Sequence, residues 1–226
     1  MTTRICVSIL PKNNLEALSL IDKAEKAQAD LIEVRLDCLE TSRNLSELVK
    51  STKVPLIATN KVVSEKGFFA GTETERQQTL LNAAKNGFEY VDVDLSSPKH
   101  KETIGKLKSL GAKPIVSFHK FDGALSSSEM EKVLEQEIAS GAIVCKIITT
   151  AKKNEDNLTA LNFVSSMSSK VKLVCFCMGE QGKVSRLLSP MFGAFFTFAS
   201  LEQGNETAAG QMAIQEMRAT YNLLGA

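Results

Sequence analysis

The sequence lacks the features of membrane-spanning, secreted and nucleic-acid-binding proteins. No run of about 18 apolar residues occurs, so we expect no transmembrane helix. The opening residues, MTTRICVSIL, enter a strand-like pattern without a signal-peptide hydrophobic region or cleavage site, which predicts a cytoplasmic location. The 27 basic and 26 acidic residues give a net charge of +1, so no global field draws nucleic acid or an anionic membrane to the chain.

Metal, redox and nucleotide motifs are absent as well. The five cysteines are odd in number, irregularly spaced and free of any CxxC pattern, which is typical of reduced core residues. Cys175 and Cys177 are expected on one face of a strand. His100 and His119 are the only histidines, and no H-x-x-x-H pair, dinucleotide-binding glycine pattern or Walker motif occurs.

What the sequence does contain is a regular alternation of short apolar runs with segments of helical period. The strand-like runs span residues 5–9, 30–36, 54–59, 90–95, 113–119, 142–148, 172–178 and 193–199. The helical segments span residues 15–27, 45–51, 73–87, 100–110, 127–141, 154–167, 182–189 and 208–224.

Eight strand-plus-helix units of about 25–30 residues each favour a parallel sheet with crossover helices. We therefore expect an α/β fold, a (β/α)8 TIM barrel, in one domain over residues 1–226. An open doubly wound sheet is the alternative, but SILPKNN stands where its glycine-rich turn would follow the first strand.

Two charged residues occupy inward positions of the second strand-like run. Barrel enzymes carry their chemistry at the carboxyl ends of the strands. Because side chains alternate across a strand, Glu33 and Arg35 are predicted to face the barrel interior, whereas Ile32 and Val34 pack on the helices. Two buried charges are costly unless they pair with each other or with a ligand, so this strand indicates a polar site.

The same alternation turns His119 and Lys146 inward. His119 ends the fifth run, where it is either a structural histidine or a general acid/base. Lys146 is expected at the end of the sixth strand, among apolar neighbours that disfavour its charged form, which makes it a candidate Schiff-base nucleophile. A lysine that extends its amine to solvent is the alternative.

The remaining strand ends add small polar groups and an apolar wall. By the same alternation, the inward residues are Ser8, Thr59, Lys61, Phe176, Met178, Phe196 and Phe198. The apolar members fit either the wall of a small-molecule pocket or plain core. Residues 204–210 are expected to form a loop on the same face.

With these residues in place, the sequence resembles the type I 3-dehydroquinate dehydratases over essentially its whole length. Five family motifs occur in order: E-x-R, S-x-H-x-F, the lysine strand, M-x-x-x-G-x-x-S-R-L, and T-F followed by [ST]-A-x-G-Q. They fall at residues 33–35, 117–121, 145–147, 178–187, and 197–198 with 207–211. Any one could arise by chance, but all five in order could not.

The third strand departs from the family pattern T-x-R-x-x-x-E-G-G. Lys61 replaces the arginine, which keeps the positive charge and loses the planar two-point fork. Glu65 keeps the acid, but Lys66 replaces the glycine that follows it, so the local turn is less well defined. Phe176 also stands where some members carry methionine, which affects only the shape of the pocket.

The resemblance implies dehydration of 3-dehydroquinate to 3-dehydroshikimate in the shikimate pathway of aromatic amino acid and chorismate biosynthesis. No metal or organic cofactor is implied, in agreement with the missing motifs. Lys146 would form a Schiff base with the ring ketone, and His119 would remove the neighbouring proton and return it to the departing hydroxyl. Glu65 would orient His119.

The resemblance also assigns substrate-binding residues. Arg186 would grip the carboxylate, although a helix-surface arginine is the alternative when the segment is taken alone. Glu33, Arg35 and Lys61 would hold ring hydroxyls, with neutral hydrogen bonds from Ser8, Thr207 and Gln211. Met178, Phe121 and Phe198 would form the apolar surroundings. A homodimer is implied by the family alone.

Two rival functions remain open at this point. A class I aldolase also uses a strand-six lysine, although His119 and Arg186 favour dehydration. A non-catalytic binding barrel derived from the enzyme would account for the altered third strand, but it gives no reason to keep a buried amine beside an imidazole.

Overall fold

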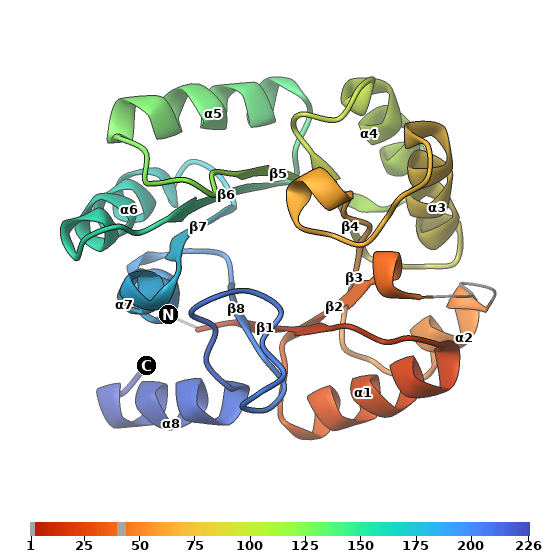
Figure 1. Ribbon diagram of the computed structural model, residues 1–226, viewed down its shortest axis with the longest axis horizontal. Helices are drawn as coiled ribbons and strands as arrows, with labels where there is room; N and C mark the ends of the chain where they lie inside the picture. Colours follow the sequence, from red (N-terminus) through yellow and green to blue (C-terminus); the bar gives the residue numbers. More distant parts are fainter. Residues whose placement is uncertain (1–2, 40–43) are drawn as a thin grey trace.

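Eight parallel strands curve into a barrel that an outer ring of helices surrounds in the computed structural model, which describes residues 3–39 and 44–226 (Figure 1). The strands are β1 (Ile5–Ile9), β2 (Leu31–Arg35), β3 (Leu56–Thr59), β4 (Tyr90–Asp94), β5 (Lys113–His119), β6 (Val144–Thr150), β7 (Leu173–Met178) and β8 (Thr197–Ala199). The helices are α1 (Asn14–Lys26), α2 (Leu45–Lys50), α3 (Glu73–Lys85), α4 (His100–Ser109), α5 (Ser127–Ala139), α6 (Glu155–Met167), α7 (Lys183–Leu188) and α8 (Ile214–Leu224).

The strand order confirms the predicted barrel. The sheet runs β7-β6-β5-β4-β3-β2-β1-β8, so chain neighbours are sheet neighbours and β8 returns to pair with β1. At the seam between β7 and β8, the Phe195 amide donates to the Leu173 carbonyl at 2.8 Å. A doubly wound sheet would reverse its strand order partway, and this sheet does not. Among the described residues, no helix has the length and apolar character needed to cross a membrane.

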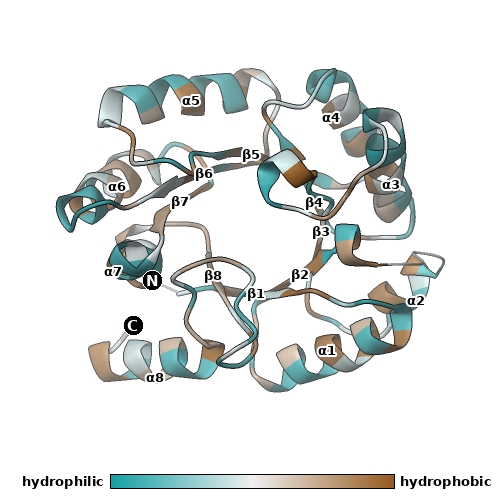
Figure 2. Cartoon of the chain, in the orientation of Figure 1, coloured by the Kyte–Doolittle hydropathy of each residue, from teal (hydrophilic) through white to brown (hydrophobic). Residues whose placement is uncertain are grey.

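Both faces of the strands carry buried apolar residues because each strand is covered on two sides. Figure 2 shows hydrophobic residues along the strands and mixed hydrophilic and hydrophobic residues on the outer helices. Inside the barrel, the buried apolar residues are Cys6, Leu31, Ile57, Tyr90, Ile115, Val144, Ile148, Val174, Phe176, Phe196 and Phe198. Cys175 and Cys177 share the outer face of β7, as predicted, and pack with Met130 of α5.

The last unit differs from the predicted boundaries. β8 begins at Thr197 rather than at residue 193, and α8 begins at Ile214 rather than at residue 208. Gly210 has a φ of +75°, and a Cβ there would lie 2.2 Å from the Gly179 carbonyl oxygen. Because the chain makes this close approach, residues 207–211 cross toward β7 before the helix starts. The helical period in this segment therefore does not form a helix, and the segment becomes part of the barrel mouth.

The loop from β3 to α3 also reaches the mouth of the barrel, and its far end is firmly capped. The Thr72 hydroxyl accepts from the Glu75 amide, and the Glu75 carboxylate accepts from the Thr72 amide at 2.8 Å. This reciprocal capping box fixes the start of α3. Residues 60–71 are thus anchored at both ends, which fixes the backbone that carries Lys61, Glu65 and Lys66 at the mouth of the barrel.

Candidate active site

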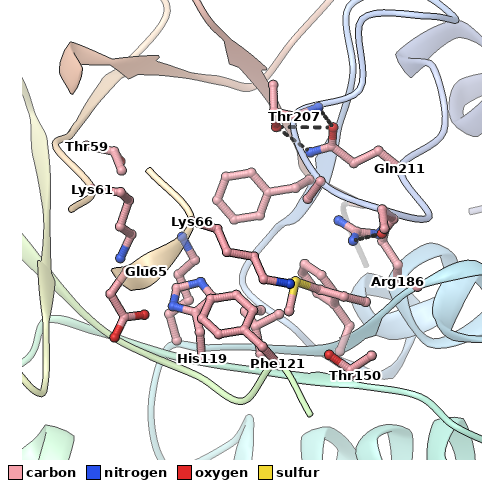
Figure 3. A pocket seen from close by; sticks show the side chains of 18 of the residues that line it. Thr59, Lys61, Glu65, Lys66, His119, Phe121, Thr150, Arg186, Thr207 and Gln211 are labelled. Atoms are coloured by element: carbon pink, nitrogen blue, oxygen red, sulfur yellow. Dashed lines mark hydrogen bonds between the residues drawn. The ribbon is translucent and has the colours of Figure 1, made fainter. Parts of the chain in front are cut away.

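The carboxyl ends of the strands surround a cavity of about 200 Å³ (Figure 3). It brings together twelve of the thirteen residues predicted from the sequence: Glu33, Arg35, Lys61, Glu65, His119, Phe121, Lys146, Met178, Arg186, Phe198, Thr207 and Gln211. The exception is Ser8, which lies beside a neighbouring hollow. A cavity this small suits a single-ring metabolite better than a drug-sized ligand.

Lys146 lies deeper than predicted. It is the third residue of β6, which continues to Thr150, because the strand keeps pairing with β7 through Met178. The side chain is buried, and its Nζ lies 4.5 Å from the centre of the Phe198 ring. The same Nζ is 3.0 Å from Asp92 Oδ2 and 3.8 Å from Glu33 Oε1. The amine is therefore enclosed, with two carboxylates and an aromatic face around it.

Asp92 and Asp94 of β4 are site residues that the sequence reasoning missed. Lys61 Nζ donates to Asp92 Oδ1 at 2.8 Å, to Asp94 Oδ1 and to Ser117 Oγ at 2.9 Å. An ammonium group has three N–H donors, so these bonds leave none for a ring hydroxyl. Lys61 is thereby placed to hold Asp92 beside Lys146 rather than to contact a substrate.

Burial alone would lower the pKa of Lys61, but the Asp92 and Asp94 charges reverse this effect and hold it above its usual range. Burial likewise opposes ionisation of Asp92, yet the Lys146 and Lys61 charges keep the pKa of that carboxyl well below its usual range. Asp94 also accepts from Arg76 Nη1 of α3 at 2.8 Å. The charges of Lys61, Asp92, Asp94 and Arg76 stabilise one another in a buried network, which Asp92 joins to Lys146.

A sequence signal for this network was available. In YVDVDL the two aspartates occupy alternate positions, so the test that found Glu33 and Lys146 turns Asp92 and Asp94 inward as well. Arg76 carried no such signal, because it reaches the network from the first turns of α3 across the barrel wall.

Glu33 is supported from two strands. Its carboxylate accepts from the hydroxyl of Ser8 on β1 and from Thr59 Oγ1 on β3 at 2.8 Å. The register places Ser8 directly beside Glu33. Ser8 therefore supports Glu33 and lies outside the cavity lining, whereas direct contact with a substrate was expected.

Arg35 holds a partner that the sequence reasoning did not name. Its Nε and Nη2 donate to the two oxygens of Asp37 at 2.9 and 2.6 Å. Asp37 Oδ2 also accepts from the Phe68 amide at 3.0 Å, which ties the β3–α3 loop to the end of β2. The guanidinium is thus oriented by a bidentate pair at the edge of the cavity.

His119 ends β5, as predicted, and its ring stacks on Phe121 with centres 5.9 Å apart and planes 9° apart. Its Nδ1 has no hydrogen-bond partner among the described residues. Burial, together with the Lys61 and Lys146 charges, lowers the pKa of His119 well below its usual range. The imidazole is consequently neutral near pH 7 and able to accept a proton.

Glu65 lies close to His119 and Asp94, with one ligand atom of each within 4.8 Å of the others. Burial and the Asp94 charge raise the pKa of the Glu65 carboxyl, whose Oε1 lies 3.4 Å from Ser96 Oγ. These three residues could ligate a metal ion, but Lys61 and Arg76 already neutralise Asp94, so a dication would face both. The arrangement suits an acid/base pair better.

Arg186 is buried in α7 and is in no ion pair within the described part of the chain. Its Nη2 donates to the Ala209 carbonyl at 3.2 Å, its Nε has no partner there, and its guanidinium lies 4.5 Å from the centre of the Phe176 ring. Burial lowers the pKa of Arg186 to about 9. An unpaired buried cation that lines a cavity favours an anionic ligand.

Thr207 and Gln211 close the side of the cavity opposite His119 in Figure 3. The Gln211 amide nitrogen donates to Thr207 Oγ1 at 2.9 Å, and Gln211 Oε1 accepts from the Thr207 backbone amide at 2.6 Å. These bonds hold the loop in shape. The Gly179 amide, which donates to the Ala209 carbonyl at 3.1 Å, joins the loop to the end of β7.

A parallel eight-stranded barrel with a buried lysine, an imidazole and an unpaired guanidinium at one cavity defines the chain as a TIM-barrel enzyme. A family model described as Type I 3-dehydroquinase matches residues 5–226. The chain therefore belongs to the type I 3-dehydroquinase family, and the resemblance found in its sequence is confirmed.

Individual relatives agree with this assignment. A 3-dehydroquinate dehydratase of Dehalococcoides mccartyi is 37% identical over 193 residues, which is 85% of each chain. One of Methanococcus maripaludis is 31% identical over 222 residues, which is 97% of this chain and 99% of the relative. Among solved structures, the type I 3-dehydroquinate dehydratase of Clostridium difficile, with covalently modified comenic acid, has a TM-score of 0.90 at 25% identity and covers 98% of this chain and 92% of its own.

Proposed function

We propose that this chain dehydrates 3-dehydroquinate to 3-dehydroshikimate in the shikimate pathway, as a hydro-lyase that works through a Schiff base on Lys146. The observation that carries the proposal is that the buried Lys146 amine, the neutral His119 ring and the unpaired Arg186 line one small cavity in a chain of this family. Nucleophile, base and anion-binding group are then within reach of a single ring.

In the first step, Lys146 adds to the ring ketone in its unprotonated form, and the hydroxyl of the adduct takes up a proton and leaves as water, which leaves an iminium ion. The iminium withdraws electrons from the neighbouring carbon, so its hydrogen becomes acidic. His119 removes that proton and an enamine forms. The enamine then expels the hydroxyl group, which takes the proton from His119 and leaves as water. Hydrolysis of the resulting conjugated iminium releases the enone product and restores Lys146.

Glu65 supports His119 in this scheme. Because the low pKa of His119 favours the neutral ring, a nearby carboxylate is needed to stabilise the imidazolium that forms after proton removal. A carboxylate oxygen of Glu65 lies within 4.8 Å of a ring nitrogen of His119, which supports this role. Asp92, held by Lys61, would keep the Lys146 amine aimed into the cavity before the ketone arrives.

Arg186 would bind the substrate carboxylate, because its guanidinium offers two parallel donors and is in no ion pair with an acid of residues 3–39 and 44–226. Glu33 and Arg35 would hold ring hydroxyls, with Thr207 and Gln211 as neutral partners. Ser8 would act indirectly by positioning Glu33, and Lys61 would act indirectly by positioning Asp92. The apolar surroundings would come from Met178, Phe121 and Phe198, which keep water from the iminium.

We further propose that residues 1–226 act as one catalytic domain in the cytoplasm and as a homodimer, which are expectations from the sequence and from the family resemblance. The dimer can be checked by sedimentation of the purified chain, where a mass near twice that of one chain is the expected result.

The test of the activity combines trapping and turnover. Incubation with 3-dehydroquinate and borohydride is expected to add a substrate- or product-sized mass to Lys146, while the ultraviolet absorbance of the enone rises in a parallel sample. Lys146→Ala is expected to abolish both signals. The matched control is Lys113→Ala, because Lys113 starts β5 at the opposite end of the barrel and forms an ion pair there with Glu89. Rising absorbance without an adduct would remove the lysine mechanism.

His119→Asn separates the two chemical steps. The variant is expected to slow turnover by about a hundredfold or more and still form the trapped imine, because Lys146 and Arg186 remain in place. Full activity in this variant would contradict the role of His119. An adduct with cleavage of a carbon–carbon bond would favour the aldolase reading, and ketone binding without turnover would favour the non-catalytic barrel.

A further inference from the structure

Five cationic side chains line the cavity, and they differ in their partners. Arg35 pairs with Asp37, and Lys61 and Lys146 share Asp92. Arg186 and Lys66 are in no ion pair within residues 3–39 and 44–226. Arg186 already has a proposed ligand in the substrate carboxylate. Lys66 is thus the remaining cation of the cavity lining that has no acidic partner among the described residues.

The β3–α3 loop presents Lys66 in a defined conformation. The Gly67 amide donates to the Val62 carbonyl at 2.9 Å, and the Phe69 amide donates to the Lys61 carbonyl at 3.0 Å. A Cβ on Gly67 would lie 2.0 Å from the Lys61 carbonyl oxygen, so the loop closes tightly at that point. Lys66 itself has a φ of +57°, a left-handed conformation that glycine adopts more easily. Lys66 thus adopts a backbone conformation that is uncommon for a lysine.

The Lys66 side chain folds over the cavity rather than away from it. Its Nζ lies 4.4 Å from the centre of the Phe121 ring, the same ring that stacks on His119. Figure 3 shows the chain of Lys66 extending across Phe121. The residue is exposed and lines the cavity. It also lines a second space, the outer hollow, which Glu180, Lys183, Gln203, Glu206 and Glu216 border. Phe121 is half-buried, and a contact between a cation and an aromatic face that solvent still reaches is weak enough to be exchanged for a ligand.

The outer hollow offers no equivalent cation. Lys183 also lines it, but its amine is paired with Glu180 at 2.7 Å, and Glu206 and Glu216 add negative charge there. Lys66 lines both the outer hollow and the cavity, whereas the buried Arg186 lines the cavity alone. An anion that enters the cavity from the hollow would therefore meet the Lys66 ammonium before Arg186.

We propose that Lys66 is a substrate-binding residue that captures the carboxylate of the incoming substrate at the cavity entrance and passes it to Arg186. This inference rests on the proposed function and adds a binding step to it. The ammonium leaves Phe121 for the carboxylate, and returns when Arg186 holds the anion. Lys66 acts on entry and takes no part in imine formation or proton transfer.

The experiment compares Lys66→Gln, Lys66→Gly and the control Lys183→Gln. Both Lys66 variants are expected to lower kcat/KM about three- to tenfold at an ionic strength of about 0.01 M, with kcat within about twofold of the original. At about 1 M salt the difference is expected to vanish, because the Debye length is then only about 3 Å and the attraction between Lys66 and the carboxylate is screened. Lys66→Gly suits the left-handed backbone, so a loss in that variant cannot come from a strained turn.

Three results would overturn the inference: an unchanged salt dependence in both Lys66 variants, an equal loss in Lys183→Gln, or a fall in kcat with KM unchanged. The last result would mean that Lys66 acts through Phe121 and His119 instead. Borohydride trapping of the original protein separates this test from that of the activity. If Lys146 is trapped and the variants respond to salt like the original, only the role of Lys66 fails; if no adduct or product forms, the proposed function fails and this inference falls with it.

Discussion

Asp92 lies between Lys61 and Lys146 and binds both, with one carboxylate oxygen 2.8 Å from the Lys61 amine and the other 3.0 Å from the Lys146 amine. A single buried anion therefore orients the candidate nucleophile and neutralises the lysine that replaces the family's arginine. The Asp92 carboxylate therefore contributes both to the stability of the barrel and to the position of the Lys146 amine.

Asp92→Asn is expected to destabilise the protein by about 3–5 kcal/mol, because the variant leaves two buried ammonium groups without their shared counter-charge. The amide nitrogen would also face a lysine donor. Denaturant unfolding of both proteins measures the change. The control is Asp122→Asn, which removes an exposed pair with Lys120 and is expected to leave the midpoint unchanged. Equal midpoints for Asp92→Asn and the original would show that the network contributes little.

Arg186→Met is expected to raise KM by about a hundredfold or more, since the anion loses a buried charged partner. Its stability is expected to stay the same or rise, because a desolvated and unpaired charge is replaced by an apolar side chain. Steady-state kinetics and thermal unfolding measure the two effects.

Arg218→Met provides the opposite control. Arg218 donates to Asp30 at 2.6 Å and to the Gln28 carbonyl at 2.6 Å, away from the cavity. This variant is expected to lose stability and keep its KM. If Arg186→Met instead lost stability with KM unchanged, Arg186 would be a structural residue.

Gly67→Ala is expected to destabilise the protein by about 1–3 kcal/mol and to reduce turnover, because the added Cβ would overlap the Lys61 carbonyl and displace Glu65 with the loop. Gly105→Ala is the matched control within α4. No atom lies within 4 Å of its added Cβ, so a gain of about 0.5–1 kcal/mol is expected there. Chemical unfolding of the two variants compares them, and a stable, fully active Gly67→Ala would show that the close approach is not required.

Glu137→Gln is expected to change how stability depends on pH. Glu137 of α5 is fully buried, and neither carboxylate oxygen has a hydrogen-bond partner among the described residues. Burial raises the pKa of this carboxyl well above its usual range. A raised folded pKa contributes stability that is present below the unfolded pKa of 4.5 and is lost as pH rises toward the folded pKa.

The glutamine variant cannot ionise, so it is expected to gain about 1 kcal/mol or more over the original at pH 9 compared with pH 5. Unfolding at a series of pH values measures the gain, with the exposed Glu135→Gln as control. Parallel curves for Glu137→Gln and the original would contradict the prediction.

The fold could be predicted because eight strand-like runs that alternate with eight helical segments are compatible with few topologies. The two-residue repeat of a strand predicted the inward positions of Glu33, Arg35, His119 and Lys146. This repeat says which way a side chain leaves the strand. It does not say how far along the barrel axis the side chain lies, which is why Lys146 was placed at the strand end.

The hydrogen-bond partners of long side chains were harder to predict. Lys61 follows the end of β3, and its flexible side chain could reach either the cavity or the barrel wall. Its bonds to Asp92 and Asp94 are therefore evident only from the structure. The start of α8 was missed for a related reason. The helical period of residues 208–213 is local, whereas the bend at Gly210 depends on contact with the distant Gly179 carbonyl.

The buried charge network of Lys61, Asp92, Asp94 and Arg76 constrains how such a barrel can diverge over time. A neutral residue at one of these positions leaves a buried charge without its partner in the barrel wall. Replacement of an acid and a base together leaves no buried charge unpaired. Homologues should therefore vary at these four sites in concert, and a homologue that regained arginine at position 61 should also differ on β4, where the acids that meet it reside.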